Sequence, residues 1–343
     1  MNYKNLETDN IKYSNKKIFT VGIVGAGDVV AKSHLPQLLA LENVSVSWVT
    51  DIDSQLAKRV ARNYNVKWLS MPLCLEDLPY TDVVLLATPY GAREPYFEVL
   101  RERNSAIYLE KPVARSVAEH KQLNALFPPS NFAVGFQRRS LGTVSLLKKM
   151  VLEEMFGRLI KVQFRHGGSA NVFSGKAFST NSKLAGGGVL IEHGIHGLDL
   201  ALFISGAKSA NSYQVKTVIE KGFDVHAEGQ IILNNSSGDY EFDFKVSWLS
   251  EVEEGLTFFF ENAIAFMSLE KPEILLKSLN GKTLVSISNT KTLYPTTGMQ
   301  VGGEFWRSFL MGINSGKKNY TSMESCLLTT EIIEKIFVKG AKQ

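Results

Sequence analysis

The chain has 343 residues, of which 44% are hydrophobic and 21% are charged, and its formal net charge is +4. These are ordinary values for a globular protein, and the length suits two domains. The positive charge is too small and scattered to indicate a nucleic-acid partner. Two cysteines, Cys74 and Cys326, do not indicate a disulfide framework, so we expect a reducing cytoplasm. No apolar run is long enough to cross a membrane.

The first 17 residues are polar and lack the apolar segment of a secretory signal, so we expect a poorly ordered leader over residues 1–17. Strand-like and helix-like runs then alternate. Strands are predicted at 18–27, 44–51, 82–89, 106–112 and 132–136, and helices at 28–41, 54–64, 92–104 and 117–127. This alternation indicates right-handed crossovers and a parallel sheet, which predicts an α/β domain over residues 18–140.

The pattern changes after residue 140. A helix at 141–155 and a strand at 158–168 precede an apolar helical segment at 186–203. Strand-like runs then follow without helices between them, at 226–235, 238–249 and 256–270, and indicate a large, mostly antiparallel sheet. Helices at 302–314 and 323–341 end the chain. We predict an α+β domain for substrate binding and oligomerisation over residues 141–343, with the last helices able to pack back on the first domain.

The stretch GIVGAGDVV places Gly25 and Gly27 between the first strand and the first helix. There the backbone can approach a pyrophosphate, and the helix N-terminus offers free N–H groups. Val30 replaces the third glycine of the usual motif, and a simple tight turn is the alternative. Asp51, at the end of the second strand, can bind both ribose hydroxyls and would repel a 2′-phosphate. The pattern therefore favours NAD, although the nearby Lys58 and Arg59 leave NADP open.

Lys111 lies in the stretch LEKP, directly after a strand, at the sheet edge where ligands bind in this architecture. A lysine at this position would lie near the nicotinamide of a bound cofactor. Burial and that cationic ring would both lower the pKa of the lysine, so that it could exchange a proton near neutrality. Glu110 can orient it. A solvated surface lysine is the alternative interpretation.

Glu192, His196 and Asp199 lie at i, i+4 and i+7 of an otherwise apolar segment, so an α-helix would place them in one stripe. A polar stripe on a buried helix needs partners or a function, because unpaired polar groups are costly inside a protein. Internal pairing is one explanation and catalysis the other. We predict no metal, since His193 and His196 are three residues apart and no cysteine cluster assists them.

The chain resembles the Gfo/Idh/MocA oxidoreductases in the stretches VGIVGAGDVVAKSHLP, TDVVLLATP, YLEKPVARS, VGFQRR and AGGGVLIEHGIHGLDL. The resemblance implies an N-terminal Rossmann domain and a C-terminal domain with a large open sheet, through which family members often pair. It also implies oxidation of a sugar, cyclitol or nucleotide-sugar hydroxyl, or reduction of the ketone, with a nicotinamide cofactor. Two other functions stay open: a non-catalytic, cofactor-sensing regulator of the same fold, and an NAD-dependent glycosidase.

The resemblance also implies roles for particular residues. Lys111 and His196 match the catalytic lysine and histidine, and Glu192 replaces the aspartate expected four residues before His196. His196 would accept the hydroxyl proton, Lys111 would stabilise the charge on oxygen, and Glu192 would orient the imidazole. Further expected contacts are with the cofactor (Thr88, Pro89, Glu110 and Lys111) and with the substrate (Asp199, Arg139, Arg165). Arg93 stands where a histidine is common in the family.

Overall fold

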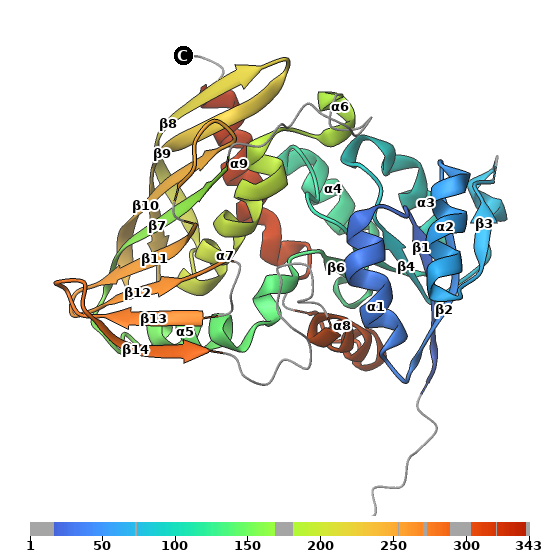
Figure 1. Cartoon of the computed structure of the whole chain (residues 1–343), viewed down its shortest axis with the longest axis horizontal. Helices are drawn as coiled ribbons and strands as arrows, with labels where there is room; N and C mark the ends of the chain where they lie inside the picture. The colour runs from blue at the N-terminus through green and yellow to red at the C-terminus, as the bar shows by residue number, and fades with distance from the viewer. Residues whose placement is uncertain are drawn as a thin grey trace, which may run out of the picture.

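A computed structural model describes residues 17–72, 74–168, 181–252, 254–269, 273–288, 303–319 and 321–340. The leader expected over residues 1–17 lies outside the described part, except for its last residue. Two sheets lie side by side, with helices between them and on the far side of the first sheet (Figure 1).

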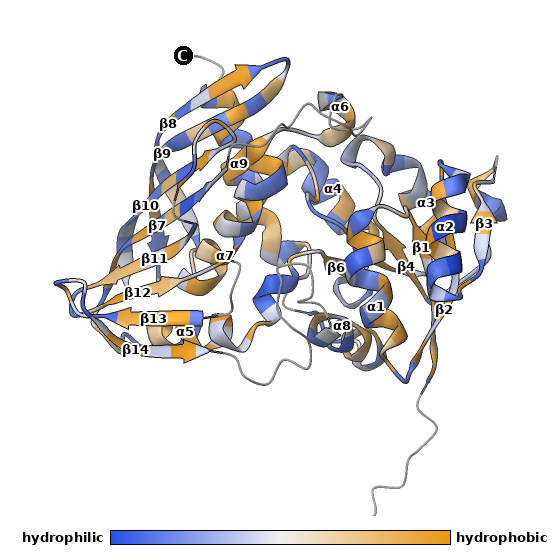
Figure 2. Cartoon of the chain, in the orientation of Figure 1, coloured by the Kyte–Doolittle hydropathy of each residue, from blue (hydrophilic) through white to orange (hydrophobic). Residues whose placement is uncertain are grey.

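The first sheet is entirely parallel, in the order β3-β2-β1-β4-β5-β6, which is the order of a dinucleotide-binding fold. Its strands are β1 (Phe19–Val24), β2 (Val44–Asp51), β3 (Trp68–Ser70), β4 (Val83–Leu86), β5 (Ala106–Leu109) and β6 (Phe132–Val134). The strands are apolar because helices cover both faces of the sheet, and those helices turn hydrophilic sides outward (Figure 2). Among the six strands of this sheet, the short strand β3 is the one that the sequence pattern did not predict.

Helices of ordinary α geometry connect most of these strands: α2 (Ser54–Tyr64), α3 (Glu94–Glu102) and α4 (Val117–Leu126). The first connection differs, because a π-helical turn, η1 (Val30–His34), precedes α1 (Leu35–Leu39). Asp53 begins α2 by accepting hydrogen bonds from the backbone N–H groups of Gln55 and Leu56.

The second sheet has the order β14-β13-β12-β11-β7-β10-β9-β8, and every neighbouring pair is antiparallel except β7 and β10. Its strands are β7 (Leu159–Gly167), β8 (Ser209–Glu220), β9 (Phe223–Asn235), β10 (Gly238–Ser247), β11 (Gly255–Phe260), β12 (Ile264–Met267), β13 (Glu273–Lys277) and β14 (Thr283–Ser288). The predicted mostly antiparallel sheet is confirmed. The sequence did not reveal β8, β13 and β14.

Three helices lie against one face of this sheet: α5 (Gly142–Leu152), α7 (Ile195–Ser205) and α9 (Leu327–Gly340) (Figure 1). The fit of α7 is close, because a Cβ atom on Gly197 would lie 2.1 Å from the ring of Phe164 on β7. Most of α7 is buried, so its apolar residues surround the helix instead of forming one stripe.

Helix α8 (Gly303–Ser315) follows the second sheet in the sequence but packs beneath the first sheet, beside α1 (Figure 1). Its side chains Phe305, Trp306, Phe309 and Leu310 share one apolar cluster with β1, β4 and β5. The core of the first domain is therefore built partly from residues near the end of the chain.

Candidate active site

Lys111 follows β5 at the carboxyl edge of the parallel sheet, where the first domain meets the second. Its ammonium donates hydrogen bonds to the backbone carbonyls of Ile191, at 3.2 Å, and Glu192, at 2.8 Å. The structure thus brings together the two sequence segments from which catalytic groups were predicted.

The carbonyls that accept hydrogen bonds from Lys111 belong to a π-helical turn, η7 (Leu190–Gly194), which leads into α7. The N–H of Ile195 reaches back five residues to the carbonyl of Leu190. Asp224 on β9 fixes the start of this turn by accepting from the N–H groups of Gly188, at 2.6 Å, and Leu190, at 2.7 Å. Sequence reasoning missed Asp224, because only the fold places it at this turn.

The wider turn breaks the predicted stripe of Glu192, His196 and Asp199. A stripe at i and i+4 requires α-helical spacing, whereas η7 has more residues per turn. The side chain of Glu192 is 59% exposed, and its carboxylate lies 4.0 Å from Nε2 of His193. None of the hydrogen bonds within the described part of the chain joins Glu192 to His196, so the expected orienting contact is not formed in this conformation.

Three imidazoles gather beside Lys111. His196 is half-buried with its ring edge-on to Phe136, and His193 stacks on His166 of β7 with 4.5 Å between ring centroids. Burial, together with the charges of Lys111 and Arg138, holds the pKa of His196 well below its ordinary range. Burial also lowers the pKa of His193 to about 3 and that of His166 to about 4. The rings of His193 and His196 are therefore neutral at physiological pH, and Nδ1 of His166 lies 3.1 Å from a carboxylate oxygen of Glu254. The pairing of His166 with His193 was not expected from the sequence.

Burial lowers the pKa of Lys111 to about 8, although the charges of Glu110 and Glu192 oppose that change. This lysine is therefore protonated in most molecules at neutral pH but can release its proton slightly above it. Such a pKa is the one that sequence reasoning expected of a group that exchanges protons.

Glu110 is buried beside Lys111 and accepts a hydrogen bond from Nε2 of His34 at 2.8 Å and one from Gln137 at 3.3 Å. Burial alone would raise the pKa of this carboxyl, but the His34 hydrogen bond and the neighbouring cations hold it below its usual value. Glu110 is therefore an anion that faces the ammonium of Lys111. Within the described part of the chain, the side-chain partners of this carboxylate are His34 and Gln137, and its contact with a cofactor stays a prediction.

The buried guanidinium of Arg93 joins two loops at the sheet edge. It donates from Nε to the carbonyl of Thr88 at 2.9 Å, and to the carbonyls of Pro112 at 2.5 Å and Lys111 at 3.3 Å. Burial lowers the pKa of Arg93 to about 10, so it keeps its charge. The residue that departs from the family pattern therefore fixes the loop after β4 against the loop that carries Lys111.

The loop between β1 and η1 fits a dinucleotide. Gly25 has φ +100°, and a Cβ atom there would lie 2.6 Å from the carbonyl oxygen of Ala87, whereas a Cβ on Gly27 would meet nothing within 4 Å. Open space over Gly27 leaves its backbone accessible to a phosphate. At the end of β4, Thr88 Oγ1 is buried and has no hydrogen-bond partner among the described residues. Both features suit a ligand that lies along this edge.

Asp51 stands at the end of β2, as predicted, with both carboxylate oxygens engaged. Oδ2 accepts from the N–H of Ala26 at 2.7 Å, and Oδ1 from the N–H of Asp53 at 2.8 Å. These bonds aim the carboxylate at the glycine turn. Each oxygen retains a lone pair for a ribose hydroxyl.

Two of the predicted substrate contacts are instead a buried ion pair. Arg139 Nε donates to Asp199 Oδ2 at 2.8 Å, and the two residues are 3% and 1% exposed. Thr329 and Ser325 add hydrogen bonds to this pair. Asp199 and Arg139 therefore tie α7 to the segment after β6 and to the last helices, and a contact of either residue with a substrate stays a prediction.

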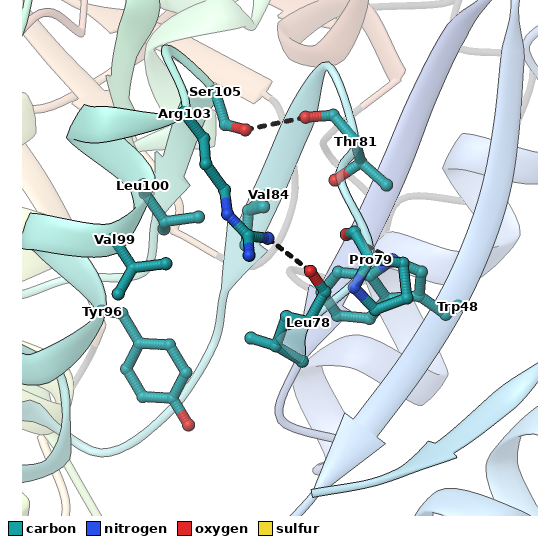
Figure 3. A pocket seen from close by; sticks show the side chains of 10 residues that line it. All are labelled: Trp48, Leu78, Pro79, Thr81, Val84, Tyr96, Val99, Leu100, Arg103 and Ser105. Atoms are coloured by element: carbon teal, nitrogen blue, oxygen red, sulfur yellow. Dashed lines mark hydrogen bonds between the residues drawn. The ribbon is translucent and has the colours of Figure 1, made fainter. Parts of the chain in front are cut away.

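The third predicted contact, Arg165, points to the other face of the second sheet. Side chains alternate along a strand, so Phe164, which packs on α7, and Arg165 lie on opposite faces. Arg165 pairs there with Asp243 at 2.8 Å and lines a hollow of about 550 Å³. This placement sets Arg165 away from the face that α7 covers, and its expected contact with a substrate stays a prediction. A second cavity, between Trp48 and Leu100, has about 10 Å³ and holds at most one water (Figure 3).

Comparisons with known proteins agree with this geometry. Residues 19–135 match the model described as "Oxidoreductase family, NAD-binding Rossmann fold", and residues 144–263 match the GFO/IDH/MocA C-terminal domain. The chain belongs to the Gfo/Idh/MocA oxidoreductase family. Within the described residues, no helix is both long enough and apolar enough to cross a lipid bilayer.

Similar proteins include sugar dehydrogenases. The chain is 26% identical over 204 residues to the D-glucoside 3-dehydrogenase of Escherichia coli, with 58% of each chain covered. It is 27% identical over 180 residues to the levoglucosan dehydrogenase of Pseudarthrobacter phenanthrenivorans, with 50% of this chain and 45% of that protein covered. The matched region spans little more than half the length of the curated relatives.

Solved structures show the same fold. A levoglucosan dehydrogenase in complex with NADH and levoglucosan has a TM-score of 0.78 at 18% identity, with 94% of this chain and 97% of that chain covered. The aldose-aldose oxidoreductase from Caulobacter crescentus has a TM-score of 0.79 at 17% identity, with 95% and 98% covered.

Proposed function

We propose that this protein is an NAD-dependent oxidoreductase that acts on a hydroxyl-bearing carbon of a sugar, cyclitol or nucleotide sugar, or on the corresponding ketone. The observation that carries the proposal is the meeting of Lys111, from the end of β5, with the His196 segment at the edge of a dinucleotide-binding sheet. Relatives named as sugar dehydrogenases support the substrate class.

The cofactor would supply the hydride chemistry, and the chain would hold the cofactor and move the proton. Gly25 and Gly27 would receive the pyrophosphate and Asp51 the ribose, while Thr88 and Pro89 would line the path to the substrate. The choice of NAD over NADP rests on Asp51, whose charge repels a 2′-phosphate. Lys58, which left NADP open, has its ammonium 4.4 Å from the ring centroid of Trp68.

Lys111 is the group that we assign to proton exchange with the substrate oxygen, because its pKa of about 8 lies near working pH. His196 would be a neutral hydrogen-bond partner of the same oxygen, since burial and neighbouring cations disfavour its charged form. This assignment differs from the sequence-based expectation that His196 accepts the proton. Glu192 contributes the carbonyl that holds Lys111, and a role for its carboxylate in orienting His196 stays a proposal.

The test is a cofactor-absorbance assay over a panel of sugars, cyclitols and nucleotide sugars, with NAD and NADP in parallel. Accumulation of reduced cofactor supports the proposal. Sugar release without net reduction would support the glycosidase, and cofactor binding without either reaction would support the regulator. A preference for NADP would contradict the assignment of Asp51.

We also propose that two copies pair through the outer face of the second sheet. The hollow there is lined by side chains of both signs, including Arg165 and Asp243, which suits a symmetric polar interface. Sedimentation equilibrium tests this, and a monomer at micromolar concentration would contradict it. A cytoplasmic location is proposed as well, since Cys74 and Cys326 are both free thiols.

A further inference from the structure

Strand β9 holds the segment formed by η7 and α7 at both of its ends. Near the start of β9, the carboxylate of Asp224 accepts from the N–H groups of Gly188 at 2.6 Å and Leu190 at 2.7 Å. At the end of β9, Asn235 donates from Nδ2 to the carbonyl of Ser205, the last residue of α7, at 3.0 Å. Asp224 is 2% exposed and Asn235 is 7% exposed, so water competes little for these bonds.

The backbone at Gly188 is fixed from both directions. Its N–H donates to Asp224, and its carbonyl accepts from the N–H groups of Ile191 at 3.1 Å and Glu192 at 2.9 Å. A Cβ atom on Gly188 would lie 2.2 Å from the backbone oxygen of Asp224, so this close approach requires glycine. Asp224 therefore fixes the point from which η7 starts.

The π geometry of η7 leaves a carbonyl for Lys111. In an α-helix, the N–H of Ile195 would bind the carbonyl of Ile191, four residues earlier. In η7 this N–H binds the carbonyl of Leu190, five residues earlier. The carbonyl of Ile191 is thereby available to the ammonium of Lys111, which also donates to the carbonyl of Glu192. The lysine can bind peptide groups here because the turn is wider than an α-helical one.

We propose that Asp224 is a positioning residue for Lys111: its carboxylate holds the start of η7 so that the carbonyls of Ile191 and Glu192 meet the lysine ammonium. Burial lowers the pKa of Lys111 to about 8. Carbonyls that accept from the ammonium favour its charged form, so the turn keeps this pKa from falling further.

Other groups act on Lys111 directly through their charges. They are the carboxylates and guanidinium groups of Glu110, Glu192, Arg93 and Arg138, and the rings of His193 and His196 also face the lysine. Asp224 reaches the lysine through the backbone of η7, and the cation that faces its carboxylate is Arg115.

The importance of this positioning for turnover rests on the proposed function. The positioning itself is measurable without a substrate, because Lys111 can be titrated in the free protein. A negative activity panel would leave the titration result standing, and a failed titration would leave the activity panel standing. Failure of the proposed function and failure of this inference are therefore distinguishable.

The experiment compares the titration of Lys111 in the full chain and in Asp224→Asn, by trace acetylation across a pH series with mass-spectrometric readout. Asparagine has the shape of aspartate, so the site stays buried, but its NH₂ group faces one of the two N–H groups and cannot accept from it. The start of η7 then shifts, and the ammonium loses hydrogen bonding to the turn. We expect the midpoint to fall by roughly 0.5 to 1 pH unit. An unchanged or raised midpoint overturns the proposal.

Two control variants separate this effect from a loss of charge or stability. Asn235→Ala removes the hydrogen bond by which the same strand holds the far end of α7. Asp199→Asn removes another buried carboxylate beside the same helix. Both should leave the Lys111 midpoint unchanged, because neither residue binds the start of η7. A fall in either control that equals the fall in Asp224→Asn overturns the proposal.

The unaltered protein provides a reading that does not depend on a folded variant. Because coupling between two sites is reciprocal, deprotonation of Lys111 should be felt at the N–H groups that bind Asp224. The amide nitrogen-15 shifts of Gly188 and Leu190 should therefore change with the same midpoint that acetylation gives for Lys111. Shifts that stay constant through that pH range overturn the proposal.

Discussion

The ammonium of Lys111 lies 2.8 Å from the backbone carbonyl of Glu192. This bond joins the edge of the first sheet to a π-helical turn of the second domain. The hydrogen bonds of the ammonium go to peptide carbonyls, while the carboxylate of Glu110 acts on it only through its charge, so a substrate oxygen can replace these carbonyls as acceptor.

Replacement of Lys111 by methionine should lower kcat by roughly 10²- to 10⁴-fold, because the group that exchanges the proton is lost. Cofactor binding, measured by fluorescence titration, should change little. Lys148→Met is the matched control, since Lys148 is a half-buried lysine whose ammonium lies 3.5 Å from the ring centroid of Phe203, away from the site. Full activity of Lys111→Met would remove the lysine from the proposed chemistry.

The pH dependence of turnover should follow the titration of Lys111. Oxidation requires the neutral amine as proton acceptor, so its rate should rise as pH increases through about 8. Reduction requires the ammonium as proton donor, and its rate should fall over the same range. Initial rates in both directions with one identified substrate provide the measurement. Parallel profiles for the two directions would contradict the assignment.

Gly27 and Gly25 should respond differently to alanine. Gly27→Ala meets no atom within 4 Å, so we expect unchanged thermal stability. Its methyl group would enter the space assigned to a pyrophosphate and raise the Kd for NADH at least about tenfold. Gly25→Ala should instead destabilise the fold by about 1–2 kcal/mol or more, because φ there is +100°. Wild-type NADH affinity in Gly27→Ala would place the cofactor elsewhere.

Asp199→Asn should reduce the free energy of unfolding by about 3–5 kcal/mol, because it leaves the buried charge of Arg139 without its anion. Glu324→Gln, which breaks the exposed pair with Lys318, should change it by no more than about 1 kcal/mol. Denaturant titrations measure both values. Equal, small effects would argue that the Arg139–Asp199 pair is open to solvent.

Protein stability should fall as pH decreases below about 6.5, the ordinary pKa of histidine. The unfolded chain takes up protons there, whereas folded His193 stays neutral until about pH 3. The unfolded state therefore binds more protons, and the stability present above pH 6.5 is lost as pH falls toward 4. Melting temperatures record the loss, and His193→Asn should make it less steep. An identical slope in that variant would contradict the burial of His193.

The sequence predicted the parallel sheet, the glycine turn and the meeting of Lys111 with the His196 segment, because each depends on local pattern and on one rule of sheet topology. The geometry of η7 was not predictable in this way, since the π turn depends on Asp224 and Lys111, which bind it from distant strands. Burial of Asp199 was equally hidden, because its partner Arg139 lies 60 residues away. The outward direction of Arg165 could have been found by counting alternate residues from Phe164.

Helix α8 has a consequence for the order in which this protein can mature on the ribosome. The nascent first domain lacks Phe305, Trp306, Phe309 and Leu310 until every described strand of the second sheet has been translated. The first domain therefore stays incomplete while the second sheet is synthesised. A chain truncated just before α8 would expose to solvent the apolar side chains of β1, β4 and β5 that α8 otherwise covers.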